Sequence, residues 1–322
     1  MAFDLRWDRL TAGRERSRAG CRGLLSAACG WRIGWLACAV MAAWFGTGML
    51  PGLALAQIGA GPAGFDTREE AVRSIPFDEL NEQAHAKLWR VVSSPSIYRR
   101  LPTQAIVCDP DLYVFLIRYP EVVVNIWQLM GVTKVQVKRT GSFTFDASDG
   151  SGTVSSVELV YGRPELHVFY AEGYYEGPLL RQRTYGSSVL VLRSTYNQQA
   201  GKPQVTHLMD AFVRLDRPGA EIVVKTLQPV VGKAADFNFI ESTKFVGQVQ
   251  QAAEMNAPGV QRLAAKLTAV GPFVRDQFAQ YARAAGQRAV LRENSRAAAG
   301  DLRAVRELPT ATIAKPTPAF RR

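Results

Sequence analysis

The chain has 322 residues, with 39 Lys and Arg against 28 Asp and Glu, and its formal net charge is +11. A charged fraction of only 21% with plentiful aromatic residues excludes a disordered chain, and four Cys are too few for a disulfide scaffold. The positive charge lies at the two ends, because residues 57–274 hold 22 basic and 21 acidic residues. A nearly neutral central region gives no basis for a nucleic-acid partner, and we expect none.

The first 56 residues have the layout of an export signal. Seven Arg lie between residues 1 and 32, an apolar run follows from Ile33 to Phe45, and Ala54-Leu55-Ala56 supplies small residues at a cleavage site. We therefore expect a signal peptide of the general secretory route, residues 1–56, that is cleaved after Ala56 and delivers the protein to the periplasm or the extracellular space. The alternative is an uncleaved anchor, because the uncharged stretch is long enough for a span of about 20 residues.

The segment 57–75 is expected to be a flexible linker. It contains the pattern G-x-G-x-x-G at Gly59–Gly64, which in dinucleotide-binding proteins follows a buried strand and opens a long helix. Here the pattern follows the leader, and Pro76 interrupts the next segment before any second strand, so no cofactor is expected. Cys108 is the one cysteine after the leader, and an internal disulfide is therefore impossible.

A domain spanning residues 76–270 is expected to begin with helices. Apolar residues recur at helical spacing over Pro76–Val92, and Ser94–Leu101 continues as a short turn or helix. Asp109-Pro110 is a helix-start signal, and Pro120 begins another helix that ends near Gly131.

From Thr133 the apolar period changes to two, which is typical of strands. Short connections rich in Gly, Pro, Asn and Asp separate these strands, so we expect an antiparallel meander of about five to seven strands. The expected strands include Thr153–Tyr161, Glu165–Tyr174, Arg183–Tyr196, Gln204–Leu215 and a last candidate, Ala220–Leu227.

The rest of the chain returns to helical spacing. Pro258 and Pro272 divide it, and residues 271–298 form a basic amphipathic helix on which Arg288, Arg292 and Arg296 share one face. This face could lie on an anionic membrane surface. Residues 299–322 have the composition of a disordered tail.

The fold class is thus α+β, with N-terminal helices, an antiparallel sheet and C-terminal helices. This order resembles the layout of the helix-grip (START-like) proteins. The resemblance implies a sheet that curls around a long helix and leaves a cavity for an apolar ligand.

Motifs of hydrolases, zincins, thioredoxin-like and P-loop enzymes are lacking, so we expect neither a catalytic site nor a metal. His167 and His207 could form an acid/base cluster with Glu165 if their strands approach, but structural roles for both are favoured. A hydrolase that uses His207 with Asp210 or His167 stays an alternative.

The tyrosines are concentrated on the expected strands, and they could line a cup for an amphipathic ligand. The candidate ligand residues are Tyr161, Tyr170, Tyr174, Tyr185, Tyr196, His167 and His207. We expect an exported, non-catalytic envelope protein that binds a lipid-like molecule between sheet and helix. The alternative is a structural or interaction protein of the cell envelope that has no cavity.

Overall fold

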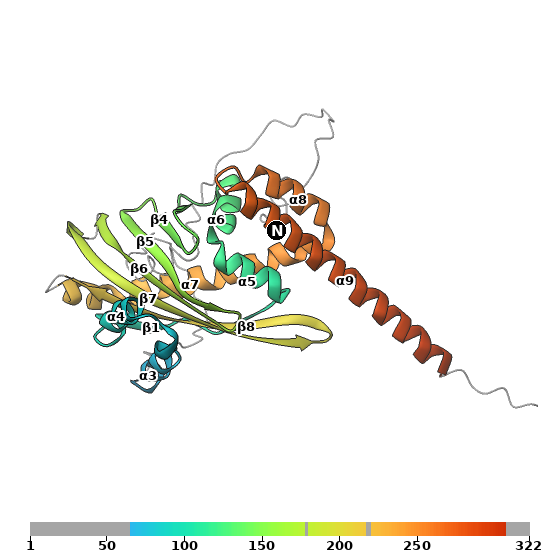
Figure 1. Ribbon diagram of the computed structural model, residues 1–322, viewed down its shortest axis with the longest axis horizontal. Coiled ribbons are helices and arrows are strands. Elements are labelled where there is room, and N and C mark those ends of the chain that lie inside the picture. Colours follow the sequence, from blue (N-terminus) through green and yellow to red (C-terminus); the bar gives the residue numbers. More distant parts are fainter. Residues whose placement is uncertain (1–64, 178–179, 217–219, 307–322) are drawn as a thin grey trace, which may run out of the picture.

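The computed structural model describes residues 65–177, 180–216 and 220–306 (Figure 1). The expected leader, the Gly59–Gly64 pattern and the chain beyond Arg306 lie outside the described residues. The helices and strands are α3 (Phe65–Arg73), η1 (Phe77–Glu79), α4 (Glu82–Val92), β1 (Ile97–Arg100), β2 (Gln104–Val107), α5 (Pro110–Arg118), α6 (Pro120–Leu129), β3 (Gln136–Arg139), β4 (Thr144–Ser148), β5 (Thr153–Arg163), β6 (Leu166–Gly177), β7 (Leu180–Gln199), β8 (Lys202–Leu215), α7 (Ala220–Met255), α8 (Ala257–Lys266) and α9 (Pro272–Arg306).

The strands form one antiparallel sheet in the order β1-β8-β7-β6-β5-β4-β3, and β2 also pairs with β8. Strands β3 to β8 follow one another as the expected meander, and the sheet has eight strands instead of five to seven. The additional strands are β1 and β2, which precede the meander in the sequence and pair with its last strand, β8.

The two helices between β2 and β3 begin where the sequence predicts. The Asp109 carboxylate accepts hydrogen bonds from the backbone N–H groups of Asp111 and Leu112, and Pro110 occupies the first turn of α5. Pro120 has the same place in α6. Two short helices before the meander and the long helix α7 after it complete the helix-grip layout, and the expected fold class is confirmed.

Each face of the sheet has a hydrophobic core of its own. Side chains on the inner face, such as Phe169 and Leu190, pack in one large cluster with residues of α5 to α9. On the outer face, Val168 and Phe212 pack with Leu88 of α4 and with Ala71 of α3. Side chains alternate between the faces along each strand, so the two clusters use alternate residues of β6 to β8.

Three expectations about local structure are wrong. Ile97–Arg100, expected in a turn or short helix, is strand β1, because it pairs with a strand more than 100 residues away. The segment expected as a linker contains α3, whose Ala71 is buried against the outer cluster. The candidate strand Ala220–Leu227 is the start of α7. The strand preference of the β-branched run at 222–224 does not decide its structure here, because such preferences depend on tertiary context.

The last helix, α9, is longer than expected and runs through Arg306 into the region expected to be a disordered tail. Its first half packs on α8, α7 and α5, and Phe278, Ala282 and Ala285 are fully buried there. Its second half projects away from the rest of the protein (Figure 1), and Leu291 is 64% exposed.

Candidate ligand site

The inner face of the sheet changes in side-chain size along its length. Large residues, including Phe169, Leu190, Leu192 and Met209, cover the part that faces α5 and the second half of α7. Toward the turn between β6 and β7, six inner positions of β5, β6 and β7 carry small residues, and the fully buried Tyr175 borders them on β6. The six are Thr153, Ser155, Ala171, Gly173, Gly186 and Ser188. Ser155, Gly173 and Gly186 are direct neighbours across the three strands, and so are Ala171 and Ser188.

Two hydroxyl groups in this small-residue floor have no hydrogen-bond partner among the described residues. Ser155 is 6% exposed and Ser188 is 1% exposed, and neither Oγ atom finds a partner in the described part of the chain. Buried polar groups in proteins are nearly always hydrogen-bonded, so two unpaired hydroxyls on one floor indicate a missing polar partner.

A hollow lies at the Gly173–Gly186 pair. The volume open to the centre of a water molecule is about 20 Å³, and the six floor residues line it together with Val154, Glu172, Tyr174 and Ser187. This volume holds one or two water molecules. A larger ligand would therefore require the hollow to widen.

A second cavity lies deeper in the protein, between α5, the sheet and α7. Its volume open to the centre of a water molecule is about 10 Å³, and its lining is Tyr113, Ile117, Leu192, His207, Met209, Phe239 and Ser242. The buried Ser242 hydroxyl has no partner among the described residues. The space and the free hydroxyl suit a single buried water molecule.

His207 belongs to a saturated hydrogen-bond network beside this cavity. Its Nδ1 lies 3.1 Å from the Tyr113 hydroxyl, its Nε2 lies 2.9 Å from Thr243 Oγ1, and Tyr113 is also 2.9 Å from Ser194 Oγ. Burial lowers the pKa of His207 to about 4. The imidazole is therefore neutral near pH 7, with both ring nitrogens engaged, which is the geometry of a structural histidine.

His167 lies on the same inner face but has different partners. Its Nε2 accepts a hydrogen bond from Arg118 Nε at 3.2 Å, and burial together with this nearby guanidinium lowers its pKa to about 4. In the sheet, His167 pairs with Leu192 while His207 pairs with Ser194, and Glu165 is exposed. The structure thus gives these three residues separate environments rather than one acid/base cluster.

The His207–Asp210 pairing fails for a simpler reason. The two residues are three positions apart on β8, so their side chains point to opposite faces of the sheet. His207 contacts α5 and α7 on the inner face, whereas Asp210 contacts β1 and β7 residues on the outer face.

The five candidate tyrosines are also divided between the faces. Tyr170 packs in the outer core, Tyr161 donates to Glu79, and Tyr174 and Tyr185 form an outer-face pair with ring centres 5.8 Å apart. Tyr196 packs against the inner core, and its hydroxyl donates to the carbonyl of Pro164 at 2.6 Å. No common cup of tyrosines is formed.

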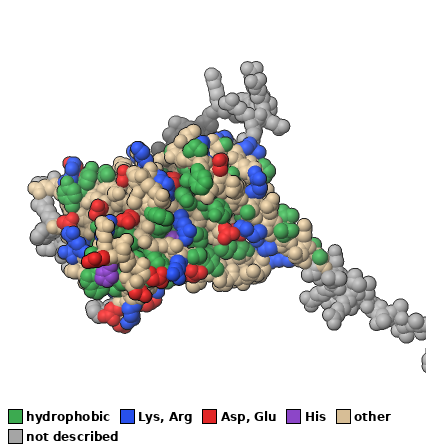
Figure 2. Space-filling view, viewed as in Figure 1, with side chains coloured by type: hydrophobic (Ala, Val, Ile, Leu, Met, Phe, Trp, Pro, Cys, Tyr) green, Lys and Arg blue, Asp and Glu red, His purple; other side chains and the backbone are tan. Residues whose placement is uncertain are grey.

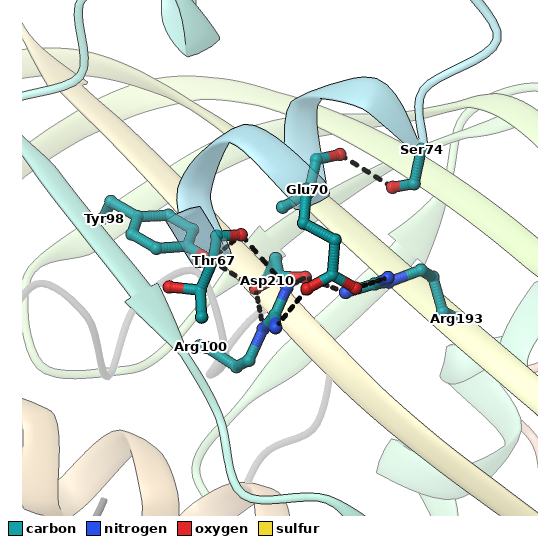
Figure 3. Close-up of polar contacts among 8 residues, drawn as sticks. Thr67, Glu70, Ser74, Tyr98, Arg100, Arg193 and Asp210 are labelled. Atoms are coloured by element: carbon teal, nitrogen blue, oxygen red, sulfur yellow. Dashed lines mark hydrogen bonds and ion pairs between the residues drawn. The ribbon is translucent and has the colours of Figure 1, made fainter. Parts of the chain in front are cut away.

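An ionic cluster on the outer face fixes α3 to the sheet (Figure 3). The fully buried Asp210 carboxylate accepts hydrogen bonds from Arg100, Arg193 and the Tyr98 hydroxyl at 2.7–3.1 Å. Glu70 of α3 binds the same two guanidinium groups at 2.8 and 2.5 Å. These hydrogen bonds, first that of Arg193 and then that of Arg100, lower the pKa of Glu70 to about 2.

The arginines expected to face a membrane are engaged within the fold. Arg288 binds both oxygens of Asp109 at 2.6 Å, and Arg292 binds Glu254 at 2.8 Å. The guanidinium of Arg296 lies against Gly201 in the turn between β7 and β8. Two of the three charges are thus neutralised by nearby carboxylates.

The described residues contain no group of three or more metal-ligating side chains and no helix that meets the length and hydropathy needed for a membrane span. Figure 2 shows basic and acidic side chains interspersed over the visible face.

Sequence reasoning missed the two serines of the small-residue floor. The available signal was the pair of glycines inside long strands, since glycine within a strand often marks a close approach of a ligand or backbone. Gly173 and Gly186 were visible in the sequence, but their pairing across β6 and β7 requires the register.

Comparison with known proteins gives only distant similarity. No protein-family model matches the chain, and no curated protein matches its sequence. Among solved structures, truncated norcoclaurine synthase from Thalictrum flavum is 10% identical with a TM-score of 0.31, and the match covers 45% of this chain and 91% of that protein. Ara h 8.0201 is 9% identical with a TM-score of 0.26, covering 45% and 99% of the two chains. The Mll3558 protein from Rhizobium loti is 12% identical with a TM-score of 0.24, covering 44% and 97%. All three scores are low, so the fold assignment depends on the strand order described above.

Proposed function

We propose that the protein is an exported, non-catalytic binding protein that holds a small amphipathic molecule between the small-residue floor and α7. The observation that carries this proposal is the pair of buried hydroxyls of Ser155 and Ser188, which have no partner in the described part of the chain and lie on a floor of Gly, Ala, Ser and Thr. Ligand pockets are largely apolar with a few polar groups that fix orientation, and the two serines would supply such groups.

The difference in side-chain size between the two ends of the inner face also supports a ligand site at the small-residue floor. Bulky residues fill the space between the sheet and the second half of α7, where the remaining cavity holds about one water molecule. The six floor positions lack such side chains, although Tyr175 borders them on β6. A ligand there would occupy volume that large residues occupy elsewhere on this face.

A binding experiment with a fluorescent probe tests the proposal. We expect 1-anilinonaphthalene-8-sulfonate to bind the folded protein saturably and to be displaced by a long-chain alcohol. Ser188→Leu, which fills the floor, should weaken probe binding at least about tenfold, and the smaller change Ser155→Val should act in the same direction.

Ser156→Leu is the matched control, because Ser156 is the next residue on β5 and is exposed on the outer face. It should leave binding unchanged. No saturable binding by the wild type, or equal binding by Ser155→Val and the wild type, would refute the proposed site. Circular dichroism establishes that each variant is folded.

Export is tested separately. The N-terminus of the protein recovered outside the cytoplasm of its own host should begin at Gln57. An intact N-terminus on a membrane-bound form would favour the anchor alternative instead.

A further inference from the structure

No described helix covers the outer face of the sheet near the turn between β6 and β7. The N-terminal helices cover the other end, where α4 contacts β7 and β8 and α3 contacts β1. On the uncovered part, Tyr185 is 52% exposed and Val154 is 39% exposed. These two residues and Tyr174 form one row across β7, β5 and the central strand β6.

Polar side chains with fixed geometry surround this aromatic row. Arg183 stacks 4.3 Å from the ring centre of Tyr174 and donates two hydrogen bonds to Glu176, at 2.9 and 2.6 Å. Glu172 lies on the other side of Tyr174 along β6, and it is exposed. Because Arg183 covers one face of the Tyr174 ring, the aromatic surface that remains open to a ligand is that of Tyr185.

We propose that this outer-face patch, formed by Val154, Glu172, Tyr174, Glu176, Arg183 and Tyr185, binds an oligosaccharide. A sugar ring has a face of C–H groups, which carry partial positive charge and pack on the electron-rich face of an aromatic ring. Its hydroxyl rim pairs with planar donors and acceptors such as guanidinium and carboxylate groups. The patch places both kinds of group side by side, with Tyr185 as its exposed aromatic ring.

The charge of the patch argues against other extended ligands. Two carboxylates and one guanidinium give it a net negative charge, which repels anionic lipid surfaces and nucleic acid. The Arg183–Glu176 pair is also half-exposed, with 46% and 58% of the side chains accessible. Such exposed pairs contribute little to folding stability. A ligand can therefore form hydrogen bonds with these two side chains at small cost to the fold.

A glycan microarray with bacterial, fungal and plant oligosaccharides tests the inference on the full exported chain. We expect binding to at least one class of saccharide. Tyr185→Ala should reduce that signal at least about tenfold, and Tyr185→Trp should retain it because a larger aromatic ring preserves the stacking surface.

Tyr161→Ala is the matched control, since Tyr161 is another outer-face tyrosine but hydrogen-bonds to Glu79 away from the patch. It should leave the signal unchanged. An array without any bound saccharide, or a signal that Tyr185→Ala does not lower, overturns the inference. Unchanged thermal unfolding of Tyr185→Ala, expected for a half-exposed side chain, excludes misfolding as the cause of a lost signal.

Discussion

At the scale of single residues, the main finding is that neighbouring positions on one strand serve opposite sides of the sheet. His207 is part of a neutral hydrogen-bond network inside the helix grip, while Asp210, three positions later, is the centre of an ionic cluster outside it. The sequence already contained this information, because two residues an odd number of positions apart on one strand point to opposite faces of the sheet. The same rule places Tyr170 and Tyr174 opposite His167 on β6.

Removing the charge of Asp210 should destabilise the protein strongly. Asp210→Asn leaves two partly buried guanidinium groups without their shared carboxylate, and we expect the free energy of unfolding to fall by about 3–5 kcal/mol. Glu70→Gln removes a half-exposed partner of the same guanidinium groups, so its expected cost is below about 1 kcal/mol. Urea denaturation measures both, and equal losses would contradict the assignment of Asp210 as the centre.

The two buried histidines should make stability fall in mild acid. Their pKa values are lowered from 6.5 to about 4, so between these pH values the unfolded chain binds more protons than the folded one. Stability must therefore decrease as the pH falls from about 6.5 to 4, by up to about 1.4 kcal/mol per pH unit for each histidine.

Urea unfolding of the wild type and His207→Gln at pH 7, 5.5 and 4.5 checks this dependence. His207→Gln lowers stability at every pH because it disturbs the Tyr113 and Thr243 hydrogen bonds, so the slopes are compared rather than the values. We expect the flatter slope in the variant. Parallel curves would mean that His207 is not titrating in this window.

At the scale of helices and strands, the sequence correctly predicted the elements that are determined by nearby residues. The starts of α5 and α6 depend on Asp109, Pro110 and Pro120, and the meander depends on a period of two with short turns. The errors concern elements that depend on distant contacts. β1 exists because β8 offers it a partner, and α3 is held by the arginines of β1 and β7.

The candidate site was predictable only in part for the same reason. The sequence indicated a ligand between the sheet and a following helix. However, the choice of tyrosines as the lining ignored which face each strand residue occupies, and a register shift at Leu159/Tyr161 makes parity along β5 unreliable. The small-residue floor needs the pairing of three strands, which no single segment encodes.

Arg288 should be the main electrostatic attachment of α9. Its guanidinium binds a carboxylate that is only 3% exposed and that also caps α5. We expect Arg288→Met to lower the free energy of unfolding by about 1.5–3 kcal/mol. Arg296→Met, in the exposed part of the same helix, should change it by less than about 0.5 kcal/mol. Thermal unfolding that ranks the two variants in the opposite order would contradict this role.

At the scale of the whole molecule, one core connects the sheet with all helices from α5 to α9. Residues from β3 to β8 and from each of these helices belong to the same buried cluster. The basic helix is therefore an integral part of the fold over its first half, and only its second half extends beyond the core.

The shared core predicts a single cooperative unfolding transition for the described domain. Near-ultraviolet circular dichroism reports on the packing of the buried Trp127, and far-ultraviolet circular dichroism reports on all helices. The two signals should have the same midpoint in a thermal or urea titration. A separate earlier loss of helix signal larger than the projecting end of α9 would show that the C-terminal helices form a second unit.

The cluster around Asp210 also sets an order of events during synthesis. Glu70 lies near the start of the described chain, but its partner Arg193 is made 123 residues later, and Asp210, which binds the same guanidinium, is made later still. Helix α3 can contact α4 and β1 earlier, but its ionic cluster is complete only when β7 and β8 have formed, because Asp210 holds both arginines in place. For most of the time that the sheet takes to emerge, α3 therefore lacks the ion pair between Glu70 and Arg193. The last strand of the sheet is the part that ends this period.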